Sequence, residues 1–225
     1  MTIPENSVSH IIKNAQGISR DFLGFNLNYY YDDLGKIKTI SGVESLRSIR
    51  CDLSYSGHKV LGKYDNLTTS EHRSMQIYLD SDSNNISSYQ DEYAYVIFTY
   101  DIISGSKRLV LSYNTSNGDT LFAHPRYEEG NLVYCESKGV SHYLSYEGRQ
   151  ANIPGINTLS VILSLGKYDK IIGILPFSIG TNNAHLVTKD SVVGDRNYYY
   201  QYHYDAKGRI DFMLLNGTTT TFTYY

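Results

Sequence analysis

Apolar and polar residues alternate along much of this chain with a period of two, which is typical of β-strands with one buried face. The clearest run, residues 25–31, places Phe25, Leu27, Tyr29 and Tyr31 on one face. A return strand led by Ile37 and Ile40 is predicted next. Comparable runs predict further strands at residues 48–55, 59–66, 74–79, 93–100, 107–113, 120–123, 132–137, 140–146, 198–204, 209–215 and 218–225. Residues 1–22 lack this alternation, so we expect an irregular or partly helical lead-in there.

A turn that combines tyrosine, an acidic residue and glycine separates many of these runs. It is complete at Tyr31-Asp32 with Gly35 and at Tyr204-Asp205 with Gly208. Looser copies begin at Tyr55, Tyr100, Tyr113, Tyr127 and Tyr146. Asp or Asn begins such a turn by bonding its own backbone, and glycine supplies the positive φ. The pattern predicts an all-β fold: an antiparallel hairpin meander of about ten to twelve strands, strongly curved or barrel-like.

The segment after Pro154 has a different pattern. Leu159, Ile162 and Leu163 recur at helical spacing, and Gly166 is a plausible stop. We therefore predict one apolar helix over residues 156–166 that packs against the sheet, within a single domain spanning residues 1–225. A segment that touches a membrane is the alternative for the same residues.

Composition narrows the classes of partner. The 225 residues carry a net charge of −3, so no basic field favours nucleic acid. No run approaches the ~18 apolar residues of a spanning helix, so we expect no such segment. The chain has 23 tyrosines and no tryptophan, and tyrosine suits a half-wet sheet face.

Location and redox state stay open at this level. The first residues carry no apolar signal region, so the protein is either cytosolic or a mature segment of an exported one. Cys51 and Cys135 are either a disulfide, which suits the cell envelope, or two unpaired strand residues.

The Tyr-Asp-x-x-Gly-(Lys/Arg)-Ile element at Tyr31 and Tyr204 resembles the tyrosine–aspartate (YD) repeats of Rhs and teneurin shells. The order of segments is similar to that of a Bacteroidetes family of envelope lipoproteins of unknown function, described as porin-like or half-barrel. Hairpins come first, an Asn-, Pro- and Leu-rich segment follows at 152–183, and tyrosine-rich hairpins close the chain. The resemblance implies a periplasmic or cell-surface location, with a lipid anchor on the full-length protein.

One polar loop has the spacing of calcium ligands. Asp80, Asp82, Asn84 and Asp91 occupy positions 1, 3, 5 and 12 of a calcium-type loop. Asn85 stands where such loops have glycine, and the closing acid is Asp in place of Glu. An ordinary polar loop is the alternative, and we expect no other cofactor.

No catalytic motif stands out, so we expect a protein that is not an enzyme. Ser141 and His142 are adjacent, but neighbours on a strand point to opposite faces. We expect binding of a glycan, a peptide or an envelope protein through tyrosines on a sheet face, with Tyr29, Tyr31, Tyr200 and Tyr202 as candidates. The alternatives are core packing of these rings, a hydrolase of an envelope or dietary polymer, and a small outer-membrane β-barrel.

Overall fold

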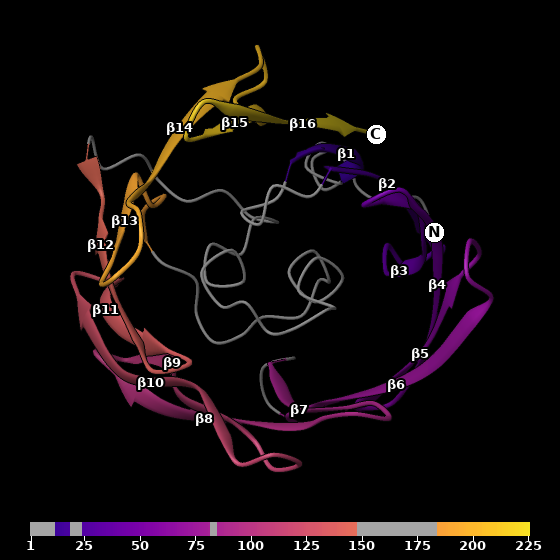
Figure 1. Ribbon diagram of the computed structural model, residues 1–225, viewed down its shortest axis with the longest axis horizontal. Coiled ribbons are helices and arrows are strands. Elements are labelled where there is room, and N and C mark those ends of the chain that lie inside the picture. Colours follow the sequence, from indigo (N-terminus) through magenta and orange to yellow (C-terminus); the bar gives the residue numbers. More distant parts are fainter. Residues whose placement is uncertain (1–11, 19–23, 82–84, 148–183) are drawn as a thin grey trace. The chain divides into compact units, whose positions relative to one another are not determined.

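The computed structural model describes residues 12–18, 24–81, 85–147 and 184–225. Sixteen β-strands follow one another along this part of the chain (Figure 1). They are β1 Ile12–Ile18, β2 Gly24–Tyr31, β3 Ile37–Glu44, β4 Arg47–Ser56, β5 Lys59–Asn66, β6 Glu71–Leu79, β7 Ile86–Gln90, β8 Tyr95–Ile103, β9 Ser106–Asn114, β10 Asp119–Glu128, β11 Asn131–Ser137, β12 Val140–Ser145, β13 Lys189–Val192, β14 Tyr198–Tyr204, β15 Ile210–Leu215 and β16 Thr218–Tyr224.

The strand order is that of a closed antiparallel barrel. Each strand lies beside its sequence neighbours, and β1 pairs with both β2 and β16. The predicted all-β antiparallel meander is therefore confirmed. Our expectation of ten to twelve strands is too low, because β1, β7 and β13 are absent from the sequence prediction.

Two further expectations concern the irregular lead-in and the apolar helix. The irregular lead-in is wrong for residues 12–18, because Gln16 of β1 pairs with Asn26 on one side and Thr221 on the other. The helix predicted at 156–166 lies outside the described residues. Within the described part, no helix is long and apolar enough to cross a membrane.

The chain packs as two compact units. The first unit contains residues 1–54, 62–74 and 199–225, and the second contains residues 55–61 and 75–198. Each unit has its own buried face, built by the same period-two alternation.

In the first unit, buried side chains form a row across three strands. Tyr29 on β2 pairs with Ile40 on β3, and Ile40 pairs with Cys51 on β4. All three are fully buried, as is Leu27. Because paired residues in a sheet point to the same face, the register sets this core.

The other face of the first unit carries many polar side chains, beside the exposed Tyr30 and Val43. Asp52 accepts hydrogen bonds from Thr39 at 2.7 Å and from the guanidinium of Arg50 at 2.8 Å. Farther along this face, the side-chain amide of Asn14 donates to the side chains of both Asn26 and Asn28. This face consequently presents hydrogen-bonding groups to solvent.

The second unit repeats the arrangement. Ile77 on β6 pairs with Tyr89 on β7, and Tyr89 pairs with Val96 on β8. Val96 in turn pairs with Asn114 at the end of β9, and all four side chains are buried. The buried side chain of Asn114 is hydrogen-bonded, because its oxygen accepts the backbone N–H of Ser116 in the following turn.

Candidate functional site

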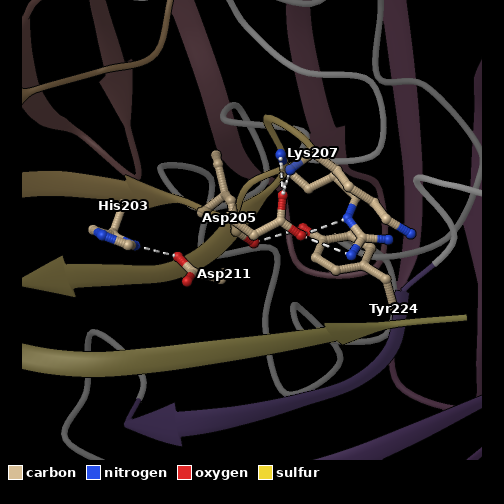
Figure 2. A network of polar contacts seen from close by, with 7 residues as sticks. His203, Asp205, Lys207, Asp211 and Tyr224 are labelled. Atoms are coloured by element: carbon tan, nitrogen blue, oxygen red, sulfur yellow. Dashed lines mark hydrogen bonds and ion pairs between the residues drawn. The ribbon is translucent and has the colours of Figure 1, made fainter.

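The two complete Tyr-Asp-Gly turns have the same hydrogen-bond pattern. In the β14–β15 turn, one carboxylate oxygen of Asp205 accepts the N–H groups of Lys207 and Arg209, both at 2.9 Å (Figure 2). In the β2–β3 turn, Asp32 accepts the N–H groups of Leu34 and Lys36, also at 2.9 Å. The predicted role of the acid as the turn initiator is thus confirmed in both copies.

Glycine completes these two turns at a position with positive φ. Gly35 has φ of 74° and Gly208 has φ of 75°. Each donates its N–H to the backbone carbonyl of the aspartate that starts the turn, at 3.0 and 2.9 Å. A residue with a Cβ would be strained there, which explains why glycine recurs.

The β14–β15 turn is tied to the last strand through Arg209. Its guanidinium bonds the second carboxylate oxygen of Asp205 at 2.7 Å and lies 4.5 Å from the ring centroid of Tyr224 on β16. Tyr224 donates its hydroxyl to the carbonyl of Ile210 at 2.7 Å. The N–H and side chain of Arg209 hold the pKa of Asp205 below its usual value, while burial raises the pKa of Tyr224 to about 12.

This tyrosine-to-carbonyl bond recurs in both units. In each case the phenol lies near the end of an even-numbered strand and donates to a carbonyl near the start of the strand before it. The pairs are Tyr31 to Ile12, Tyr100 to Ile86, Tyr127 to Leu109, Tyr146 to Leu132 and Tyr224 to Ile210. Most tyrosines of the repeated turn element therefore link the two strands of one hairpin through a hydrogen bond from the phenol.

Cations cover two more of these rings in the second unit. The ammonium of Lys107 lies 5.7 Å from the ring centroid of Tyr100, and the guanidinium of Arg108 lies 5.3 Å from that of Tyr127. Burial raises the pKa of both phenols and lowers the pKa of Arg108. The same arrangement of a tyrosine ring, a cation above it and a carbonyl that accepts its hydroxyl therefore recurs along the chain.

The four tyrosines predicted as ligand contacts are mostly occupied by packing. Tyr29 is fully buried, Tyr200 is buried, and Tyr31 and Tyr202 are half-buried. Burial raises the pKa of both Tyr29 and Tyr202. Tyr31 packs edge-on against Tyr225, with ring centroids 5.9 Å apart. Among the described residues, these rings are placed to stabilise the first unit.

Two of the four predicted calcium ligands already have partners. Asp80 pairs with the ammonium of Lys107 at 2.6 Å, and Asp91 accepts the N–H groups of Tyr93 and Ala94. The five-residue strand β7 separates Asp80 from Asp91, a span of about 17 Å at the usual strand rise. Asp82 and Asn84 lie outside the described residues, and the described part contains no cluster of three metal-binding side chains. Calcium binding stays a prediction.

A buried histidine–carboxylate pair lies in the second unit. The Nδ1 atom of His142 on β12 lies 3.0 Å from a carboxylate oxygen of Asp190 on β13. Cys135 on β11 pairs directly with His142 in the register, and it is fully buried. Ser141 points to the other face, as predicted. The sequence did not reveal this pair, because a long segment separates β12 from β13.

Neither cysteine is in a disulfide. Cys51 lies in the first unit and Cys135 in the second, and both side chains are buried. Burial raises the pKa of the Cys51 thiol to about 12. A buried, protonated thiol is unreactive, so Cys51 acts as a small apolar core residue.

A pair of tyrosines, Tyr143 exposed and Tyr134 half-buried, lies on the second unit. Tyr134 on β11 pairs with Tyr143 on β12, and their ring centroids lie 5.0 Å apart with planes tilted by 53°. Tyr143 is 49% exposed. The hydroxyl of Tyr134 donates to the carboxylate of Glu136 at 3.0 Å and lies 3.2 Å from the hydroxyl of Ser141.

The pairing of Tyr134 with Tyr143 could have been predicted from the sequence. The predicted strands at 132–137 and 140–146 are joined by the two-residue turn Lys138-Gly139, so Ser137 must pair with Val140. The same register then brings Tyr134 opposite Tyr143. What the sequence could not show is that Tyr143 remains exposed while Tyr29 and Tyr200 are buried.

Flanking residues give the pair a mixed polar rim. Arg126 on β10 pairs with Tyr134 in the register, and its guanidinium lies 3.2 Å from Glu128. Ser191 on β13 pairs with Tyr143 on the other side. Aromatic rings, a carboxylate, hydroxyls and a guanidinium therefore share one face of β10 to β13.

The fold of this chain is similar to that of a protein of known structure. The chain is similar to a porin-like protein from Bacteroides vulgatus ATCC 8482, with a TM-score of 0.55 and 12% identity, over 96% of this chain and 99% of that chain. A likeness at this identity establishes the fold alone, so the chain has a porin-like antiparallel β-barrel fold, and the porin-like expectation is confirmed at that level. No family model and no curated protein matched the chain. The resemblance to YD repeats and to lipoproteins stays a prediction.

Proposed function

We propose that this protein is a non-catalytic β-barrel of the bacterial cell envelope that binds a saccharide on the exposed face of β11 and β12. The observation that carries the proposal is the ring pair of Tyr143, which is exposed, and Tyr134, which is half-buried. A sugar ring has an apolar face that stacks on a tyrosine and a rim of hydroxyls that need hydrogen bonds. Glu136 and Ser141 supply such groups beside the rings.

The envelope location is supported by the fold and by the exposed strand faces. The porin-like neighbour comes from a Bacteroides species. A lipid-facing strand needs an apolar outward band, whereas the exposed face of the first unit carries Arg50, Asp52 and Asn26. These side chains favour a barrel that faces water over one that spans the outer membrane.

Titration of immobilised bacterial and plant polysaccharide fragments with the purified protein tests the proposal. We expect Tyr143→Ala to weaken binding at least about tenfold, the usual effect of losing a stacked aromatic contact. Tyr143→Phe should retain most of the affinity, and Glu136→Gln should lose part of it.

Tyr199→Ala is the matched control, because Tyr199 is similarly exposed but lies in the first unit. It should bind like the unaltered protein. Absence of binding to every fragment, or an equal loss in Tyr199→Ala, would overturn the proposed site. Binding of peptides in place of sugars would overturn the ligand class.

A further inference from the structure

The turn between β3 and β4 has an unusual residue at its tip. Ser45 and Leu46 join Glu44 to Arg47, which pair across the hairpin, and both turn residues have positive φ, 50° and 68°. A two-residue hairpin turn of this geometry favours Asn-Gly, because the left-handed region strains residues with a branched or bulky side chain. Leucine therefore makes this turn less stable than the residues that usually occupy it.

Packing does not compensate for that strain. The Leu46 side chain is 94% exposed. An apolar side chain at such a position lowers the stability of the fold in two ways. Its backbone is strained at positive φ, and its apolar surface stays exposed to water. Such a residue is expected where an apolar tip is needed for contact with something else.

A second leucine lies on the adjacent turn. Leu67, between β5 and β6, is 61% exposed. Its N–H donates to the carbonyl of Ser48, and the N–H of Ser48 donates to the hydroxyl of Thr68, both at 2.8 Å. These two bonds fix the β5–β6 turn against the start of β4, one residue after Arg47. Two apolar tips therefore occupy the same edge of the first unit.

The charged side chains around the tips leave one cation available. Arg47 is exposed and makes no ion pair within the described part of the chain. Glu71 and Arg73, at the other turn, pair with each other. Glu44 lies opposite Arg47 and is half-buried. A guanidinium beside an apolar tip can bind a phosphate while the tip enters an apolar layer.

We propose that Leu46 and Leu67 insert into the surface of a phospholipid bilayer and that Arg47 binds lipid phosphate, so that this edge of the first unit docks on a membrane. A folded protein partner would need about 800 Å² of complementary surface, which two separate convex tips do not offer. A fluid lipid surface accepts isolated apolar side chains without a matching pocket. The occupant is therefore a phospholipid surface.

The absence of tryptophan from the chain makes a clean test possible. Three single variants, Leu46→Trp, Leu67→Trp and Leu34→Trp, each carry one fluorescent reporter. Leu34 is the matched control, because it is 79% exposed on the turn at the other end of β3. With vesicles of equal parts phosphatidylethanolamine and phosphatidylglycerol, we expect a blue shift of the emission for the variants at 46 and 67 and none at 34.

Three results would overturn the proposal. They are no shift at 46 and 67, an equal shift at 34, and a shift that follows protein concentration without vesicles. The last result would assign the edge to contact with a second copy of the chain.

A stability readout separates docking from damage to the fold. Leu46→Asn should raise the thermal midpoint, because Asn tolerates positive φ, and should weaken vesicle partitioning about tenfold. Leu34→Asn should leave partitioning unchanged. Arg47→Gln should weaken binding to these anionic vesicles and reduce its salt dependence. Partitioning that is unchanged in Leu46→Asn would contradict the proposal.

Discussion

Asp32 and Asp205 make the same pair of side-chain hydrogen bonds to their own turns, although they lie near opposite ends of the chain. In both turns the aspartate N–H also donates to the carbonyl four residues on, at 2.8 Å. The repeated sequence element is thus a repeated structure with one physical purpose, the closing of a hairpin.

Removal of the turn carboxylate should destabilise the protein modestly. We expect Asp32→Ala to lower the free energy of unfolding by about 1 kcal/mol, because the N–H groups of Leu34 and Lys36 lose their acceptor but can still bind water. Asp32→Asn should recover most of this, since its amide oxygen also accepts. Urea unfolding gives the values, and Asp33→Ala, an exposed neighbour, is the control that should change little. An equal loss in Asp33→Ala would contradict the assigned role.

Alkaline pH should reveal the buried phenol of Tyr224. Its pKa is about 12 in the folded protein, against an ordinary value of 10.0, because burial disfavours the phenolate. The unfolded chain therefore loses this proton first, so the contribution to stability is complete below pH 10 and declines as pH rises toward 12. Tyr224→Phe should lose about 1 kcal/mol at neutral pH with its bond to Ile210, and its stability should fall less steeply in the alkaline range. Urea midpoints across that range measure both effects, and parallel slopes would refute the assignment.

A buried and an exposed histidine–aspartate pair should contribute very differently to the free energy of unfolding. His142 and Asp190 are buried. Figure 2 shows the contact of His203 with Asp211, which is largely exposed. The His203 ring also stacks on that of Phe212. Asp190→Ala leaves a buried imidazole without its partner and should lower the free energy of unfolding by about 1–3 kcal/mol. Asp211→Ala should change it by about 0–1 kcal/mol. Chemical unfolding of both variants measures the contrast, and similar losses would show that burial does not decide the outcome.

The sequence missed strands that carry weak local signals. β1 contains Asn14, Gln16 and Gly17, which have low strand preference, and it forms because β2 and β16 pair with it on either side. The short strand β7 lies inside the loop interpreted as a calcium site, and β13 has only four residues. In each case neighbouring strands supply the hydrogen bonds that local preference does not.

The candidate site, too, was only partly predictable from the sequence. The turn between β11 and β12 fixes the register, so the pairing of Tyr134 with Tyr143 follows from local sequence. The sequence does not show which tyrosines remain exposed, because most of the strands carry a tyrosine on one face or the other. The sequence-based candidates Tyr29 and Tyr200 are buried by neighbours that a local pattern does not identify.

The sequence by itself determined the antiparallel hairpins, their turns and most of their boundaries, because period-two alternation and Asp-Gly turn chemistry act over a few residues. Tertiary structure alone decided the closure of β1 on β16, the burial of His142 with Asp190 and the exposure of Tyr143. Those features depend on contacts between residues far apart in the chain, where no local preference specifies the partner.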